Sequence, residues 1–151
     1  MHMSTDRIEK SIVLQAPRSR VWRAIAGAAE FGAWFGVTLE GDFAPGARLT
    51  AQLTSPGYEH VTMEITTERV EPEHLLSYRW HPYAIEPGVD YANEPTTLVE
   101  FYLAEVPEGT RLTVIESGFD HIPPARRALA FRMNDQGWAE QLTNIARYVS
   151  S

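Results

Sequence analysis

The sequence contains no cysteine at any of its 151 positions. This absence excludes disulfide bonds, thiolate metal sites and cysteine nucleophiles together, and it fits a reducing cytoplasm. Long apolar runs are also missing, and no segment approaches the roughly 20 apolar residues of a membrane-spanning helix. The N-terminus lacks the basic and apolar stretches of a signal peptide. We therefore expect a cytoplasmic protein.

Basic residues are few. The chain has 13 Lys and Arg against 20 Asp and Glu, a net charge of −7, and its pI is about 5.2. A field of this sign repels the phosphates of nucleic acids and the head groups of anionic lipids. The charge therefore predicts no nucleic-acid partner and no membrane partner.

The overall composition is that of a globular protein. Hydrophobic residues make up 44% and charged residues 22% of the chain, close to the globular average. Aromatic residues reach 11%, more than a minimal core needs, and this permits a lined cavity. The length suits one core. We expect a flexible N-terminal segment over residues 1–7 and a single domain over residues 8–150.

The hydrophobic pattern predicts a strand, two short helices, six strands and a long helix. Residues 8–14 form the first strand, and apolar residues spaced by three or four predict a helix after Pro17 and a helical turn to Phe35. Period-two alternation then predicts strands over residues 37–40, 47–53, 61–66, 76–80, 99–103 and 112–116, with a loop at about 81–95. This block is typical of an antiparallel meander with one buried face.

From Pro123 onward the period becomes helical. One apolar stripe runs along this helix through Ala128, Phe131, Asn134, Trp138, Leu142, Ile145 and Val149. Gly137 is unfavourable inside a helix, so we expect either a close approach to the backbone there or a bend. Only this helix is long enough to cover the sheet, which predicts an α+β fold with a curved antiparallel sheet around a C-terminal helix.

Short motifs along this order resemble activator of heat shock protein 90 ATPase homologue domains, in the START-like (helix-grip, SRPBCC) superfamily. They are Arg20 to Ile25, Glu30-Phe31, Trp34-Phe35-Gly36, Gly41-Asp42-Phe43, Val70-Glu71-Pro72, Glu116-Ser117-Gly118-Phe119 and Gly137-Trp138. The resemblance implies a single-domain bacterial type with an internal cavity, and a link to the stress response. Because the additional domain of the eukaryotic co-chaperones is missing, it implies little about chaperone activation.

Residue patterns for catalysis or cofactors are scarce. No histidine stands at a zinc-like spacing from another ligand, so we expect no metal. Ser117 lacks the glycine of a nucleophile elbow, and no glycine-rich phosphate loop occurs, so we expect no cofactor and assign no catalytic residue. His81 follows Trp80 at the rim of the predicted sheet, where a bond to the backbone is the favoured interpretation.

Two polar residues stand on apolar stripes. Glu116 continues the face of Leu112 and Val114, and Asn134 lies on the stripe of the long helix. A buried carboxylate is costly unless it is paired or protonated. One hypothesis makes the two residues polar anchors of an apolar pocket, with a raised carboxyl pKa. The alternative pairs Glu116 with an arginine, such as Arg79 or Arg132, near the rim.

We expect the domain to bind a small apolar or amphipathic molecule between sheet and helix, in a pocket of roughly a few hundred Å³. Two alternatives stay open: a cyclase- or hydrolase-like enzyme using Glu116 as acid or base, and a co-chaperone-like module with a protein partner. The predicted ligand-binding residues are Trp34, Phe35, Tyr78, Trp80, Phe101, Glu116, Phe119, Phe131, Asn134 and Trp138.

Overall fold

The computed structural model describes residues 6–54, 56–82 and 93–150, and its elements follow the predicted order. The elements are β1 (Arg7–Leu14), α1 (Arg18–Ala26), α2 (Ala28–Phe35), β2 (Val37–Glu40), β3 (Arg48–Leu53), β4 (Thr62–Glu71), β5 (Leu75–Trp80), β6 (Thr97–Val106), β7 (Gly109–Ser117), the 3-10 helix η1 (Phe119–His121) and α3 (Pro124–Ser150). Only η1 was not predicted. The predicted N-terminal segment lies outside the described residues at positions 1–5, and the predicted loop does so at positions 83–92.

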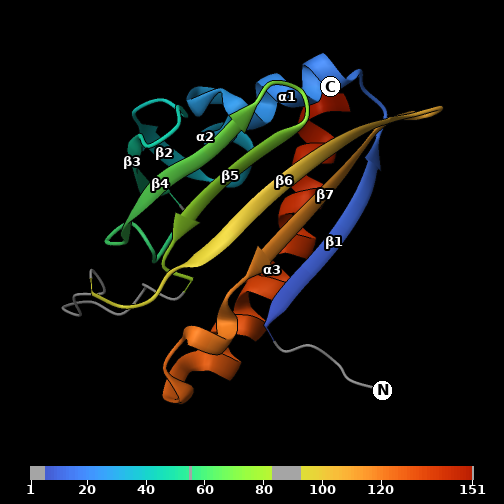
Figure 1. Cartoon of the computed structure of the whole chain (residues 1–151). Coiled ribbons are helices and arrows are strands. Elements are labelled where there is room, and N and C mark those ends of the chain that lie inside the picture. The colour runs from blue at the N-terminus through green and yellow to red at the C-terminus, as the bar shows by residue number, and fades with distance from the viewer. Residues whose placement is uncertain (1–5, 55, 83–92, 151) are drawn as a thin grey trace, which may run out of the picture.

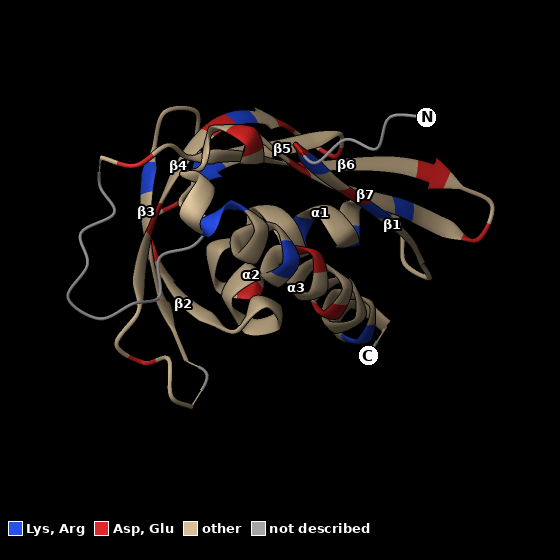
Figure 2. Cartoon of the chain, turned by 90° about the horizontal axis from the view of Figure 1, so that it is seen from below, with Lys and Arg blue, Asp and Glu red and all other residues tan. Residues whose placement is uncertain are grey.

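The strands form one antiparallel sheet in the order β1-β7-β6-β5-β4-β3-β2. The sheet curves, and Figure 2 shows the three α-helices inside its concave side. Since β1 and β2 are the two edge strands, α1 and α2 carry the chain from one edge of the sheet to the other (Figure 1). This confirms the predicted α+β helix-grip architecture.

The apolar stripe of α3 faces the sheet along most of its length. Trp138, Leu142, Ile145 and Val149 are buried, as the spacing predicts. Ala128 is an exception, because it is exposed. The first turns of α3 lie beyond the ends of the strands in Figure 1, so the sheet does not cover this position. No α-helix in the described part of the chain is both long and apolar enough to span a membrane.

The predicted inner face of β7 is also confirmed. Leu112, Val114 and Glu116 are all fully buried. The register of β7 with both of its neighbours is unbroken, and Glu116 is paired with Ile8 on one side and Val99 on the other. No bulge therefore shifts Glu116 to the outer face.

A polar cluster fastens the helices together at the end of α3 that is remote from Glu116. The Glu30 carboxylate accepts hydrogen bonds from Arg20 Nη1 at 2.6 Å and from the Tyr148 hydroxyl at 3.1 Å. The Arg20 guanidinium also lies 5.2 Å from the centre of the Tyr148 ring. The three side chains come from α1, α2 and α3, so this cluster fixes how the helices meet.

Candidate functional site

Glu116 is fully buried, and its carboxylate accepts four side-chain hydrogen bonds. Oε2 accepts from Trp80 Nε1 at 2.8 Å, Thr97 Oγ1 at 2.5 Å and Asn134 Nδ2 at 3.2 Å. Oε1 accepts from Trp138 Nε1 at 2.8 Å. Indole and amide N–H groups can only donate, so the cluster is built around an oxygen pair that accepts.

The strand register and the helix period bring these donors together. Trp80 and Thr97 are paired across β5 and β6. Asn134 and Trp138 are four residues apart on α3, so they lie one turn apart on one face. Because that face meets the concave side of the sheet, the sequence-predicted convergence of Glu116 and Asn134 is realised as a direct hydrogen bond.

Burial and hydrogen bonding act on the Glu116 pKa in opposite directions. Burial raises this pKa, while the bonds from Thr97, Trp80, Trp138 and Asn134 lower it, and the net pKa is raised above the ordinary value of 4.5. The predicted alternative of an arginine partner is wrong, because neutral donors surround this carboxylate. Arg79 Nε instead donates to Glu68 at 2.7 Å, and Arg132 is exposed.

Aromatic rings fill the space next to Glu116. Trp80 and Trp138 stack with their ring centres 5.8 Å apart and their planes at 28°. The Phe35 ring lies 5.9 Å from each of these two indoles, and Phe101 lies 5.6 Å from Trp138. This inner end of the space between sheet and α3 is therefore closed by packed rings.

A cavity of about 200 Å³ opens beside this packed cluster, between α2, β2, the strands β3 to β5 and α3. It lies beside the stacked rings, which occupy the inner end of this space. Most of its lining side chains are apolar. The described lining residues are Phe35, Gly36, Val37, Leu53, Met63, Trp80, His81, Pro82, Met133, Asn134 and Gln141.

The α2 wall of this cavity depends on a glycine. Gly32 lies where a Cβ atom would be only 2.5 Å from the Val37 carbonyl oxygen, so its absence lets α2 pack directly against β2. Gln141 Nε2 donates a 2.8 Å hydrogen bond to the carbonyl oxygen of Phe35 at the end of α2. The close approach at Gly32 sets how α2 packs on β2, and the hydrogen bond from Gln141 ties α3 to the end of α2 beside the cavity.

The close approach to the backbone that was one expectation for Gly137 is absent. A Cβ atom there would meet no other atom within 4 Å, and α3 continues as one helix through this position. Met133 and Gln141 line the cavity one turn before and one turn after Gly137. On this face of α3, the missing side chain leaves open space between two cavity-lining residues.

The structure separates the predicted ligand-binding residues into groups. Phe35, Trp80 and Asn134 line the cavity, whereas Glu116 and Trp138 lie in contact with them, outside the lining. The remaining predicted residues do not line this cavity; they are Trp34, Tyr78 and Phe101 in the packed core, and Phe119 and Phe131, whose rings lie 5.2 Å apart. Ligand contact by any of these residues stays a prediction.

Of the eleven described lining residues, the sequence predicted only Phe35, Trp80 and Asn134; Met63, Met133 and Gln141 are among the eight that were not predicted. Met63 lies on the predicted inner face of its strand, so the alternation already contained a signal for it. Met133 and Gln141 lie beside the apolar stripe of α3, and their positions depend on where α2 meets α3. The periodicity of hydrophobic residues in the sequence does not show where α2 meets α3.

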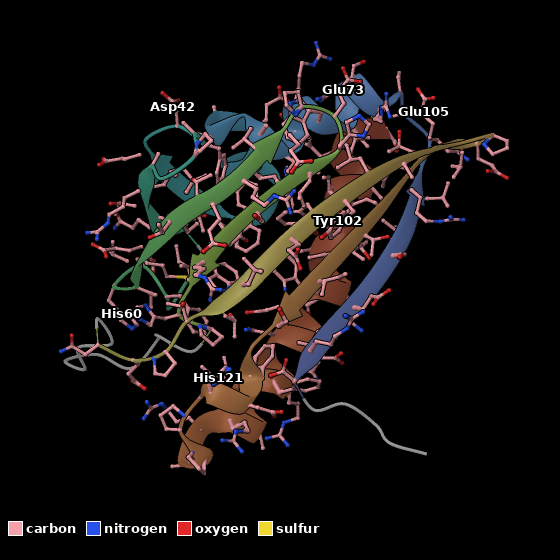
Figure 3. All side chains as sticks on the ribbon, in the orientation of Figure 1. Asp42, His60, Glu73, Tyr102, Glu105 and His121 are labelled. Atoms are coloured by element: carbon pink, nitrogen blue, oxygen red, sulfur yellow. The ribbon has the colours of Figure 1, made fainter. Side chains whose placement is uncertain are left out.

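Two of the described histidines, His60 and His121, lie on different parts of the fold. Figure 3 shows His60 near the β3–β4 connection and His121 near the start of α3. His81 Nε2 bonds to the backbone carbonyl oxygen of Glu94 at 3.1 Å, which confirms the favoured interpretation of this residue. Among the described residues, no group of three or more His, Cys, Asp or Glu side chains is placed to hold a metal ion.

Comparisons with known proteins agree with this architecture. A crystal structure of a Mesorhizobium loti protein is 22% identical, with a TM-score of 0.76, and the match covers 95% of this chain and 96% of that one. A Nitrosomonas europaea protein is 19% identical over 99% and 97% of the two chains, with a TM-score of 0.77. DynU16, from the dynemicin biosynthetic locus, is 25% identical with a TM-score of 0.74, over 97% of this chain and 48% of DynU16.

No curated protein matches the sequence. The profile of one family, described as activator of Hsp90 ATPase homolog 1-like protein, matches residues 15–150. This match spans both short helices, six of the seven strands and the long helix that covers them. The chain has the helix-grip fold of the START-like superfamily, and it belongs to the family of activator of Hsp90 ATPase homolog 1-like proteins.

Proposed function

We propose that this protein binds a small, mainly apolar molecule in the cavity between α2, the sheet and α3. One observation carries the proposal: in an open cavity of about 200 Å³ with mostly apolar walls, the lining side chains Trp80 and Asn134 are both anchored by a buried carboxylate. Ligand sites typically combine apolar walls with a few fixed polar groups. An apolar protein cavity of roughly 150 Å³ holds benzene, so a molecule of one or two rings suits this volume.

The position of Glu116 favours binding over acid–base catalysis. A general acid or base must come within hydrogen-bond reach of a substrate atom. Glu116 is fully buried, does not line the cavity and is surrounded by four hydrogen-bond donors from the protein. Its proposed role is to orient Trp80 and Asn134, which do line the cavity, so it acts as a positioning residue.

Large exposed apolar side chains give little support to a protein-docking function. The four that the described residues include are Val13, Tyr58, Tyr102 and Leu129. They lie on β1, the β3–β4 connection, β6 and α3, and Figure 3 shows Tyr102 on β6. Single exposed apolar residues are normal on a protein surface and do not form a docking patch.

Calorimetric titration with one- and two-ring aromatic compounds tests the proposal. Gly137→Met should place a side chain in the open space on α3, and we expect it to weaken binding at least about tenfold, the equivalent of roughly 1.4 kcal/mol. Ala128→Met adds the same side chain at an exposed position of the same helix and should leave the affinity unchanged. Absence of binding by every compound, or equal affinity in wild type and Gly137→Met, would contradict the proposal.

A further inference from the structure

We propose that the cavity selects ligands whose polar end is an uncharged hydrogen-bond donor, a hydroxyl or an N–H group, over ligands that end in a carboxylate. This inference rests on the proposed function and specifies the chemical class of the ligand. It comes from the hydrogen bonds that the polar lining residues already make, because these bonds determine which donors and acceptors remain for a ligand.

The orientation of the Asn134 amide is fixed by Glu116. Asn134 Nδ2 donates to Glu116 Oε2, and when Glu116 is ionised the reversed amide would place two acceptor oxygens against each other. This bond uses one of the two N–H groups of Nδ2, and the amide oxygen Oδ1 remains as an acceptor. Among the described residues, no hydrogen bond to this oxygen is made, and Asn134 lines the cavity. Its amide group therefore offers a ligand an acceptor, which pairs with a donor.

Other polar groups of the lining already donate to the protein. Gln141 uses its amide nitrogen on the Phe35 carbonyl oxygen, and its amide oxygen accepts from Asn144 Nδ2 at 3.1 Å. Trp80 Nε1 donates to Glu116, and His81 Nε2 bonds to a backbone carbonyl oxygen. Each of these bonds directs one side-chain N–H at a protein oxygen, where it stabilises the walls, and the Gln141 amide nitrogen keeps its second N–H.

The charge of the lining also disfavours an anion. No lysine or arginine lines the cavity within the part of the chain that the structure describes. Burying a carboxylate without a donor or a cation carries a large desolvation penalty. The Glu116 carboxyl group also lies directly beside the side chains of Trp80 and Asn134, so an anionic ligand would meet a like charge whenever Glu116 is ionised.

Three naphthalenes with the same ring system test this inference by calorimetry at neutral pH: 2-naphthol, 2-methoxynaphthalene and 2-naphthoate. We expect 2-naphthol to bind at least about fivefold more tightly than its methyl ether, the value of one neutral hydrogen bond. We expect 2-naphthoate to bind most weakly. In Asn134→Leu the preference for 2-naphthol over the ether should disappear, and near-ultraviolet circular dichroism checks that this variant keeps its fold.

Gln136→Leu is the matched control, because it also replaces an amide side chain by leucine on the same helix, at an exposed position that does not line the cavity. It should keep the wild-type preference for 2-naphthol. Equal binding of all three compounds, tighter binding of 2-naphthoate, or an unchanged preference in Asn134→Leu would overturn the inference while leaving the proposed binding function intact. Failure of all three to bind the wild-type protein would instead overturn the proposed function.

Discussion

The space between the sheet and α3 has two unlike ends. At the inner end, Trp80 and Trp138 stack and Glu116 is saturated with hydrogen bonds. At the outer end, side chains such as Met63 and Met133 surround an open cavity of about 200 Å³. The two ends share Phe35, Trp80 and Asn134. The polar cluster thus builds a rigid back wall, and the open volume lies on the other side of that wall.

A buried polar residue and an open cavity therefore need not coincide. Glu116 would be expensive to bury alone, and its four donors are what make its position tolerable. Because the donors are themselves large, they fill the volume that a ligand would need near the carboxylate. If the two ends differ in energy as they do in packing, substitutions at the closed end should lower the free energy of unfolding more than substitutions at the open end.

The largest expected effect is at the closed end. Trp138→Ala should lower the free energy of unfolding by about 3–5 kcal/mol, because it removes a buried ring and one of the donors to Glu116. Met133→Ala, at the half-buried outer end, should cost less than about 1.5 kcal/mol. Urea unfolding measures both. Similar losses in the two variants would mean that the ends do not differ in packing.

Removing the acceptor at the closed end should have the next largest effect. Glu116→Leu fills a similar volume but leaves the N–H groups of Trp80, Trp138 and Asn134 without their partner. Each buried donor without a partner lowers the free energy of unfolding, and the burial of the apolar leucine side chain offsets part of this loss. We expect a loss of about 2–3 kcal/mol in urea unfolding. A more stable variant would show that the hydrogen bonds do not compensate for burying the carboxylate.

Two helix glycines should respond to alanine with opposite signs. In Gly32→Ala the new Cβ atom would meet the Val37 carbonyl oxygen at 2.5 Å, so we expect a loss of about 1–3 kcal/mol. In Gly137→Ala the Cβ atom enters open space, and we expect a gain of about 0.5–1 kcal/mol from helix propensity. Thermal unfolding of the pair checks this. Equal signs would contradict the close approach at α2 or the open face of α3.

The pH dependence of the free energy of unfolding should include a contribution from the titration of Glu116. Since its folded-state pKa is raised, its contribution to the free energy of unfolding is fully present below about 4.5 and is lost as pH rises through the folded-state pKa. The indole N–H signals of Trp80 and Trp138 should follow this titration by NMR. Trp34 donates to the Ala24 carbonyl oxygen, which does not titrate, and is the internal control. A Glu116 midpoint below 4.5 would contradict the raised pKa.

Most of the fold could be predicted from the sequence because its hydrophobic residues recur with clear strand and helix periods. Alternation placed Glu116 on the inner face, and three- and four-residue spacing placed Trp138 and Asn134 on the covered side of α3. The cavity was less predictable, because its walls depend on how closely α2 approaches β2 at Gly32. Ala128 shows the same limit, since its exposure depends on where the sheet ends.

The most direct test of the central claim maps a bound ligand by methyl NMR. Met63 and Met133 both line the cavity, whereas Leu112 and Ile145 are fully buried and do not line it. On titration with 2-naphthol, we predict saturable shifts of the Met63 and Met133 methyl signals, with much smaller shifts for Leu112 and Ile145. Saturable binding that leaves both methionine signals unmoved would place the ligand elsewhere and contradict the account.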